Sequence, residues 1–129
     1  MAIHEFGLSI DDFQNPKVYK NTEAILTLLT RLLLLEPGTI QSHPEMGVGL
    51  ISKYRYSVEG NAQLLQSDFQ RQLDKYLPQL QGVKVRVSEK GSSYFITAEF
   101  ERVLYGISFD TQKSTVTTDT MVLSDLQGG

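Results

Sequence analysis

The apolar residues between positions 83 and 109 recur at every second position, and this period constrains the fold more than any other feature of the chain. They form three runs: Val83, Val85 and Val87; Tyr94, Ile96, Ala98 and Phe100; and Tyr105, Ile107 and Phe109. A two-residue period is typical of β-strands with one buried face. The connections are short, so we expect an antiparallel β-meander with its first turn at residues 89–92. The aromatic residues of these runs are interpreted as core.

Two earlier segments have the period of an amphipathic α-helix. In the first, apolar residues follow the i, i+3, i+4, i+7 and i+8 pattern: Ile25, Leu28, Leu29, Leu32 and Leu33. We expect this helix to begin after an N-cap at Asn21 or Thr22 and to end at Glu36, because Pro37 disfavours helical geometry at the residue before it. A second helix is predicted from about Gly60 to Leu77. Two such helices can cover one face of the meander, which predicts an α+β fold.

The two ends of the chain carry further β-strand patterns. Near the N-terminus, residues 6–10 alternate in polarity and predict a short strand. In the middle of the chain, by contrast, residues 51–56 have no clear pattern. Residues 114–123 are rich in β-branched side chains. They predict either a fourth strand of the same sheet or an exposed strand that pairs with another chain. The 129 residues are expected to form a single domain, with residues 112–129 as its C-terminal strand and tail.

A loop rich in proline and glycine follows the first helix. On the helical wheel, Glu36 falls at the centre of the apolar arc, so its carboxylate is expected to face protein and to need backbone N–H groups or a cation. The other residues that shape this loop are Pro37, Gly38, Pro44, Gly47 and Gly49. Glycine permits unusual backbone angles and proline removes freedom, so the loop is predicted to be rigid.

Three apolar residues fall outside the core pattern. Leu34 lies opposite the apolar arc of its helix, Leu64 lies off the stripe of the second helix, and Phe95 lies on the other face of its strand. These positions predict side chains on the surface and are a hint of an oligomeric setting.

Composition excludes several classes of function. The net charge is −3, which gives no general attraction to nucleic acid or to an anionic membrane. The absence of cysteine and the presence of only two histidines argue against disulfides, a thiolate site and zinc. The N-terminal residues lack a secretory signal pattern and no apolar run is long enough to cross a bilayer, so we expect a soluble intracellular protein.

The candidate catalytic residues form no recognisable motif. A glycosidase needs two carboxylates across a cleft, and Glu36, Glu45, Glu59 and Asp68 are candidates, but a chain with 15 acidic residues offers such pairs by chance. The Gly47–Gly49 segment lacks the strand and the third glycine of a dinucleotide site. His43 is interpreted as a loop residue. In residues 53–56, basic and aromatic residues alternate, and this segment is interpreted as a surface strand or a protein contact.

Three motifs follow one another between residues 25 and 50: the helix at 25–35, the Glu36-Pro37-Gly38 turn, and the segment Pro44-Glu45-Met46-Gly47-Val48-Gly49-Leu50. Their order resembles that of the baseplate wedge proteins of contractile-tailed phages, the family of the T-even phage tail-sheath initiator, once labelled lysozyme-like. That family has an amphipathic helix, a Pro-Gly or Glu-Pro-Arg turn, and a segment in which proline and an acidic or aromatic residue precede hydrophobic-Gly-x-Gly-Leu. The later order of helix, meander and β-rich tail is similar too.

The resemblance implies a structural role in the tail baseplate of a virion assembled in the bacterial cytoplasm. Family members contact the helical core bundle of the wedge through the Glu-Pro-Arg turn and offer strands that the first sheath subunits join. Glu36 and Pro37 match that turn, whereas Gly38 stands where the family has arginine. Arg31 is a candidate replacement for that arginine, although its position on the helical wheel disfavours this role. The implied partners are the tail sheath protein, the wedge core subunits and the tail tube proteins, with no nucleic acid, membrane or cofactor.

The motifs and the resemblance together predict two partner-binding regions and no enzymatic activity. The docking loop contributes Glu36, Pro37, Gly38, Pro44, Gly47 and Gly49, and the C-terminal strand contributes Val116, Thr118, Thr120 and Val122. Three alternatives stay open: a lysozyme-like peptidoglycan hydrolase, a generic adaptor, and the equivalent component of a type VI secretion system or phage-tail-like bacteriocin.

Overall fold

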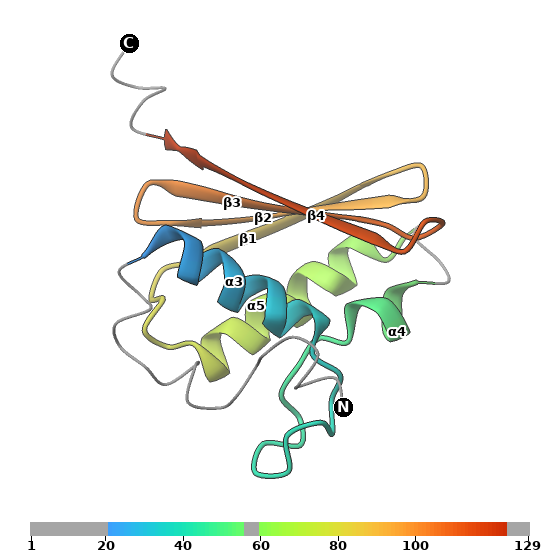
Figure 1. Cartoon of the computed structure of the whole chain (residues 1–129), viewed down its shortest axis with the longest axis horizontal. Coiled ribbons are helices and arrows are strands. Elements are labelled where there is room, and N and C mark those ends of the chain that lie inside the picture. Colours follow the sequence, from blue (N-terminus) through green and yellow to red (C-terminus); the bar gives the residue numbers. More distant parts are fainter. Residues whose placement is uncertain (1–20, 56–59, 124–129) are drawn as a thin grey trace.

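The computed structural model of the chain describes residues 21–55 and 60–123, and Figure 1 shows these as one sheet above a layer of helices. The helices are α3 (Thr22–Leu34), α4 (Leu50–Tyr54) and α5 (Ala62–Tyr76). The strands are β1 (Lys84–Lys90), β2 (Ser93–Phe100), β3 (Val103–Asp110) and β4 (Thr115–Val122). The strand predicted at residues 6–10 lies outside the described residues.

The four strands form an antiparallel meander in the order β1-β2-β3-β4, which confirms the predicted α+β fold. The segment at 114–123 is therefore a fourth strand of the chain's own sheet. The first turn is shorter than expected, because Glu89 pairs with Tyr94 and Lys90 pairs with Ser93. Only residues 91 and 92 connect β1 to β2.

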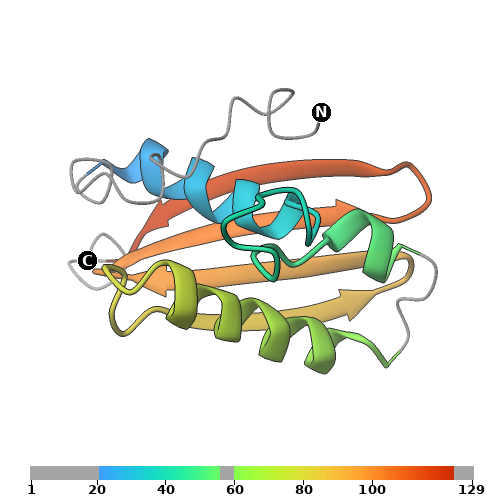
Figure 2. The same cartoon turned by 90° about the horizontal axis from the view of Figure 1, so that it is seen from below.

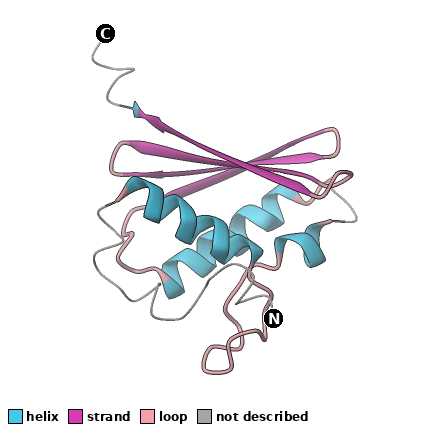
Figure 3. Ribbon diagram, in the orientation of Figure 1, coloured by secondary structure: helices cyan, strands magenta, loops and turns pink. Residues whose placement is uncertain are grey.

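The described helices cover one face of the sheet and leave the other open (Figure 3). Seen from below, α5 follows the β1 side of the sheet and α3 crosses the side of β3 and β4 (Figure 2). The core between the layers contains the inward side chains of the three predicted strand runs and the stripes of both helices. Tyr94, Tyr105 and Phe109 are almost fully buried in it, as the two-residue period predicted.

Helix α3 begins where its cap was expected. The Asn21 Oδ1 accepts a hydrogen bond from the Ala24 N–H at 3.1 Å, and all five predicted apolar residues of the helix are buried. The helix ends at Leu34 rather than at Glu36, because Leu35 already has an extended backbone. Leu34 is another correction: it was expected on the surface, but it is half-buried and packs against the core, where burial of its apolar side chain is favourable.

Residues 51–54 belong to α4 and not to a surface strand. Tyr54 is buried in this helix and so offers no exposed ring for stacking, and residue 56 lies outside the described residues. Among the residues expected on the surface, Leu64 and Phe95 are exposed, and Met121 and Val122 on β4 join them.

Candidate interaction site

The loop between α3 and α4 folds back to cap the end of α3. The Val48 N–H donates to the Leu32 carbonyl at 3.1 Å, and the Gly49 N–H donates to the Leu35 carbonyl at 2.9 Å. The last carbonyls of a helix have no partner within the helix, so these bonds satisfy groups that would otherwise be buried without one. The predicted docking loop is thus fixed to the helix that precedes it.

Gly47 shows why this loop needs glycine. Its φ is +118°, and a Cβ at this position would lie 2.2 Å from the Leu35 carbonyl oxygen. Its N–H donates to Gln72 Oε1 at 2.8 Å, while Gln72 Nε2 donates to the Glu45 carbonyl at 3.0 Å. The buried Gln72 side chain therefore ties the loop to α5.

The predicted docking residues divide into two groups by exposure. Pro37, Gly38 and Pro44 are exposed, whereas Gly47 and Gly49 are buried and shape the loop from inside. The exposed members are the ones that a partner could contact.

Glu36 is half-buried at the start of this loop. Its Oε2 lies beside Gly49, 3.4 Å from where a Cβ would be, and its backbone carbonyl accepts bonds from Thr39. In the described part of the chain, no hydrogen bond or ion pair engages its carboxylate, so the expected internal N–H or cation is not found.

A buried carboxylate lies next to the loop. Asp68 on α5 is 5% exposed and accepts from Lys53 Nζ at 2.9 Å, from the Tyr54 hydroxyl at 2.9 Å and from Arg71 Nη2 at 2.6 Å. Burial raises the pKa of Tyr54 well above its ordinary value, and the hydrogen bond to Asp68 acts in the same direction. Both oxygens of Asp68 are engaged, as is typical of a structural ion pair.

The loop and α5 enclose a hollow of about 390 Å³. Its lining consists of Pro37, Pro44, Glu45, Gly47, Val48, Lys53, Asp68, Arg71, Gln72 and Lys75. Lys75 pairs with Glu45 at 3.2 Å, and this hydrogen bond, followed by the nearby Tyr76, raises the pKa of Lys75. Lys75 therefore stays cationic at neutral pH.

Gln72 has no role that the sequence pattern predicted, and Asp68 was predicted only as a candidate acid. Both follow Leu65 at the i+3 and i+7 positions of the apolar stripe of α5, where a polar residue is costly to bury without partners. That placement was the available signal, because polar residues within an apolar stripe are usually buried and hydrogen-bonded.

The two edges of the sheet differ. On β1, the Val85 N–H donates to Gln70 Oε1 at 3.1 Å and the Val87 N–H donates to Gln66 Oε1 at 2.9 Å. Gln70 Nε2 also donates to the Val83 carbonyl at 3.1 Å. Glutamines of α5 thus occupy the backbone groups that β1 would offer to another strand.

No strand of the described residues pairs with the outer edge of β4. The Leu123 N–H donates to the Arg102 carbonyl at 2.7 Å, and hydrogen-bonded residues alternate along an antiparallel pair. Every second residue counted back from Leu123 therefore directs its backbone N–H and carbonyl groups at β3. The residues between them direct these groups outward, away from the sheet. The outward residues are the four predicted on this strand: Val116, Thr118, Thr120 and Val122.

Within the described residues, one of these outward N–H groups has a partner. The Thr120 N–H donates to Asp119 Oδ1 at 2.8 Å, a contact between neighbours that leaves the rest of the edge uncovered. The edge of β4 can therefore accept a strand from another molecule, with the Thr120 N–H released from Asp119 as that strand forms.

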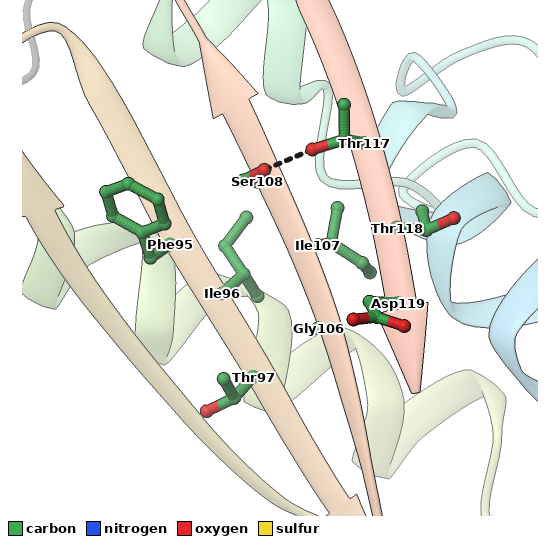
Figure 4. Close-up of a pocket in the computed structure, with 9 residues that line it drawn as sticks. All are labelled: Phe95, Ile96, Thr97, Gly106, Ile107, Ser108, Thr117, Thr118 and Asp119. Atoms are coloured by element: carbon green, nitrogen blue, oxygen red, sulfur yellow. Dashed lines mark hydrogen bonds between the residues drawn. The ribbon is translucent and has the colours of Figure 1, made fainter. Parts of the chain in front are cut away.

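The open face of the sheet has a shallow hollow of about 220 Å³ over Gly106, shown in Figure 4. Phe95 and Thr97 of β2 and Asp119 of β4 line it, and Ser108 and Thr117 hydrogen-bond across β3 and β4. The glycine leaves room that a side chain would fill, so this face is uneven and partly apolar.

Among the residues that the structure describes, the other candidate groups form no recognisable catalytic motif. Glu45 and Asp68 line the same hollow, Glu59 lies outside the described residues, and the ring of His43 packs edge-on against Tyr76. Over residues 21–55 and 60–123, no group of metal-ligating side chains gathers, and no helix has the length and apolarity to span a membrane.

Comparison of the chain with protein-family models, with curated proteins and with solved structures found no significant match.

Proposed function

We propose that this chain is a structural baseplate wedge protein of a contractile tail, which docks on the wedge core and initiates sheath assembly by pairing its β4 edge with a sheath strand. The motif resemblance at residues 25–50 suggests this setting. The observation that carries the proposal is the asymmetry of the sheet, in which α5 blocks the β1 edge while β4 presents outward backbone groups. The protein acts through assembly, in a virion baseplate, without breaking a covalent bond.

The edge-pairing step is tested by Thr118→Pro. A proline at this outward position removes a donor that the chain's own sheet does not use, and its ring obstructs an added strand. Baseplates that carry this variant are expected to lose sheath polymerisation in a sedimentation and electron-microscopy assay. Thr117→Ala, on the same strand with its backbone directed at β3, is the control. Normal sheath growth on Thr118→Pro baseplates, with the variant folded and incorporated, would contradict the proposal.

The docking step is tested at the two acidic residues of the loop. Glu36 has no ion pair with a described residue, whereas Glu45 pairs with Lys75. Glu36→Ala is expected to weaken incorporation into wedges more than Glu45→Ala does, measured by copurification with a wedge subunit. Equal effects would remove the special role of Glu36.

A peptidoglycan hydrolase is the rival, because Glu45 and Asp68 line one hollow. Both carboxylates are held by cations, which is unlike a general acid that donates a proton to a leaving group. A turbidity assay on purified cell walls decides the matter. Clearing of the walls that Asp68→Asn or Glu45→Gln abolishes would favour the enzyme.

A further inference from the structure

Three cationic side chains line the hollow beside the docking loop. Lys53 comes from α4, and Arg71 and Lys75 come from α5, one turn apart. The chain as a whole has a net charge of −3, so this gathering of positive charge departs from the average of the molecule. Charges of one sign around a concave surface select ligands of the opposite sign.

These cations have donors left over after their internal contacts. Arg71 is 70% exposed and uses Nη2 for Asp68, and a guanidinium has five N–H donors. Lys53 and Lys75 are about half exposed and each has one ion pair, while an ammonium has three donors. The exposed rim can therefore bind further acceptor oxygens.

The two acids of the hollow differ in how much they oppose this charge. Asp68 is buried beneath the cations with both oxygens engaged. Glu45 is 80% exposed and faces Lys75, where it occupies a place that an external carboxylate could take. The opening of the hollow is therefore cationic, with Glu45 as an internal competitor.

We propose that this hollow receives an acidic segment of a partner protein, with a carboxylate on Arg71 and Lys75. Pro37 and Pro44, which are exposed, supply apolar contact beside the charges, which suits a peptide better than a small inorganic anion. The planar guanidinium binds a carboxylate through two parallel hydrogen bonds. The inference rests on the proposed function for the identity of the partner, and it names the chemistry that the docking loop recognises.

The test selects peptides from a displayed random decapeptide library on the purified chain, and then measures their affinity by fluorescence anisotropy. Peptides rich in Asp and Glu are expected, with weaker binding as salt rises. Arg71→Gln with Lys75→Gln should weaken binding about tenfold, because two partly exposed ion pairs are lost. Lys84→Gln with Arg86→Gln removes the same charge from exposed positions on β1 and should leave binding unchanged.

Glu45→Gln is expected to increase the affinity for acidic peptides. Damage to the fold would lower that affinity, so it cannot explain an increase. Removing the internal competitor frees Lys75, so the acidic peptides should bind about threefold more tightly. The inference is overturned if no peptide is selected, if the selected peptides are not acidic, or if both double variants weaken binding equally.

The experiment separates this inference from the proposed function because it uses the isolated chain. If acidic peptides bind the hollow and sheath growth on Thr118→Pro baseplates is normal, the sheath-initiating role is contradicted and the inference about the hollow is supported. If that variant loses sheath growth but the library yields no acidic peptides, the inference about the hollow is contradicted and the sheath-initiating role is supported.

Discussion

At the scale of single residues, the loop after α3 depends on backbone positions that only glycine fits. Gly47 and Gly38 both have positive φ angles, of +118° and +91°. They differ in their surroundings, because a Cβ on Gly47 would collide with the Leu35 carbonyl, whereas a Cβ on Gly38 would meet nothing within 4 Å. This pair separates the cost of an unusual backbone angle from the cost of a collision.

We predict that Gly47→Ala lowers the free energy of unfolding by at least about 2 kcal/mol, since it adds a backbone collision to the strain of positive φ. Gly38→Ala should cost about 1 kcal/mol, from strain alone. Urea denaturation followed by circular dichroism measures both. Equal losses would show that the contact with Leu35 relaxes at no cost.

Buried tyrosines make the free energy of unfolding depend on pH in the alkaline range. Burial is the main cause that raises the pKa of Tyr54, Tyr94 and Tyr105 above the ordinary value of 10.0. Below that value both the folded and the unfolded chain keep the phenol protons. Above it the unfolded chain loses them first, so stability falls as the pH rises.

We therefore expect the free energy of unfolding to fall as the pH rises above about 10, as measured by urea titrations at each pH. Tyr54→Phe should be less stable at neutral pH, because Asp68 loses one donor, but its loss on going to high pH should be shallower. An identical pH slope in the variant would mean that Tyr54 does not contribute to it.

At the scale of elements, the helices and the sheet edges are coupled. The Glu89 carboxylate of β1 accepts from the N–H groups of Gly60 and Ala62 at the start of α5, and glutamines further along α5 cover the β1 edge. Helix α5 is thus joined to β1 by hydrogen bonds along its length. Without this helix, β1 would direct unpaired backbone groups outward, as β4 does among the described residues.

Amide hydrogen exchange should detect this difference between the edges. We predict slow exchange at Val85 and Val87 and faster exchange at Thr118 and Val122 in the isolated chain. Gln66→Ala should speed exchange at Val87 and cost about 1 kcal/mol of stability, because the N–H loses its partner. Gln63→Ala, at an exposed position of the same helix, is the control. Equally fast exchange at both edges would contradict the proposed asymmetry.

At the scale of the whole molecule, one layer of helices and one sheet enclose a single core, to which β4 contributes little. Only Val116 of that strand packs against the core, and the remaining β4 side chains are exposed. Most of the hydrophobic stabilisation therefore comes from α3, α5 and the first three strands.

Removing residues 112–129 should leave a folded domain, because the core survives. We expect a lower melting temperature than that of the full chain, since the β3–β4 ladder is lost, and we expect no sheath polymerisation on baseplates that carry the truncation. Circular dichroism and electron microscopy are the measurements. Normal sheath growth with the truncated chain would exclude β4 as the initiating strand.

The sequence by itself determined α3, α5 and the strands β1 to β3, because the period of apolar residues depends only on local geometry and on which face is buried. It did not predict α4, and it left open whether β4 joins the chain's own sheet. It also indicated the glycines of the loop and the alternating residues of β4. It did not reveal that Gln66 and Gln70 cover β1, that Gln72 ties the loop to α5, or that three cations share one hollow with Asp68. Those contacts join residues far apart in the chain, and only the packing of α5 against the loop and the sheet brings their polar groups within hydrogen-bonding distance.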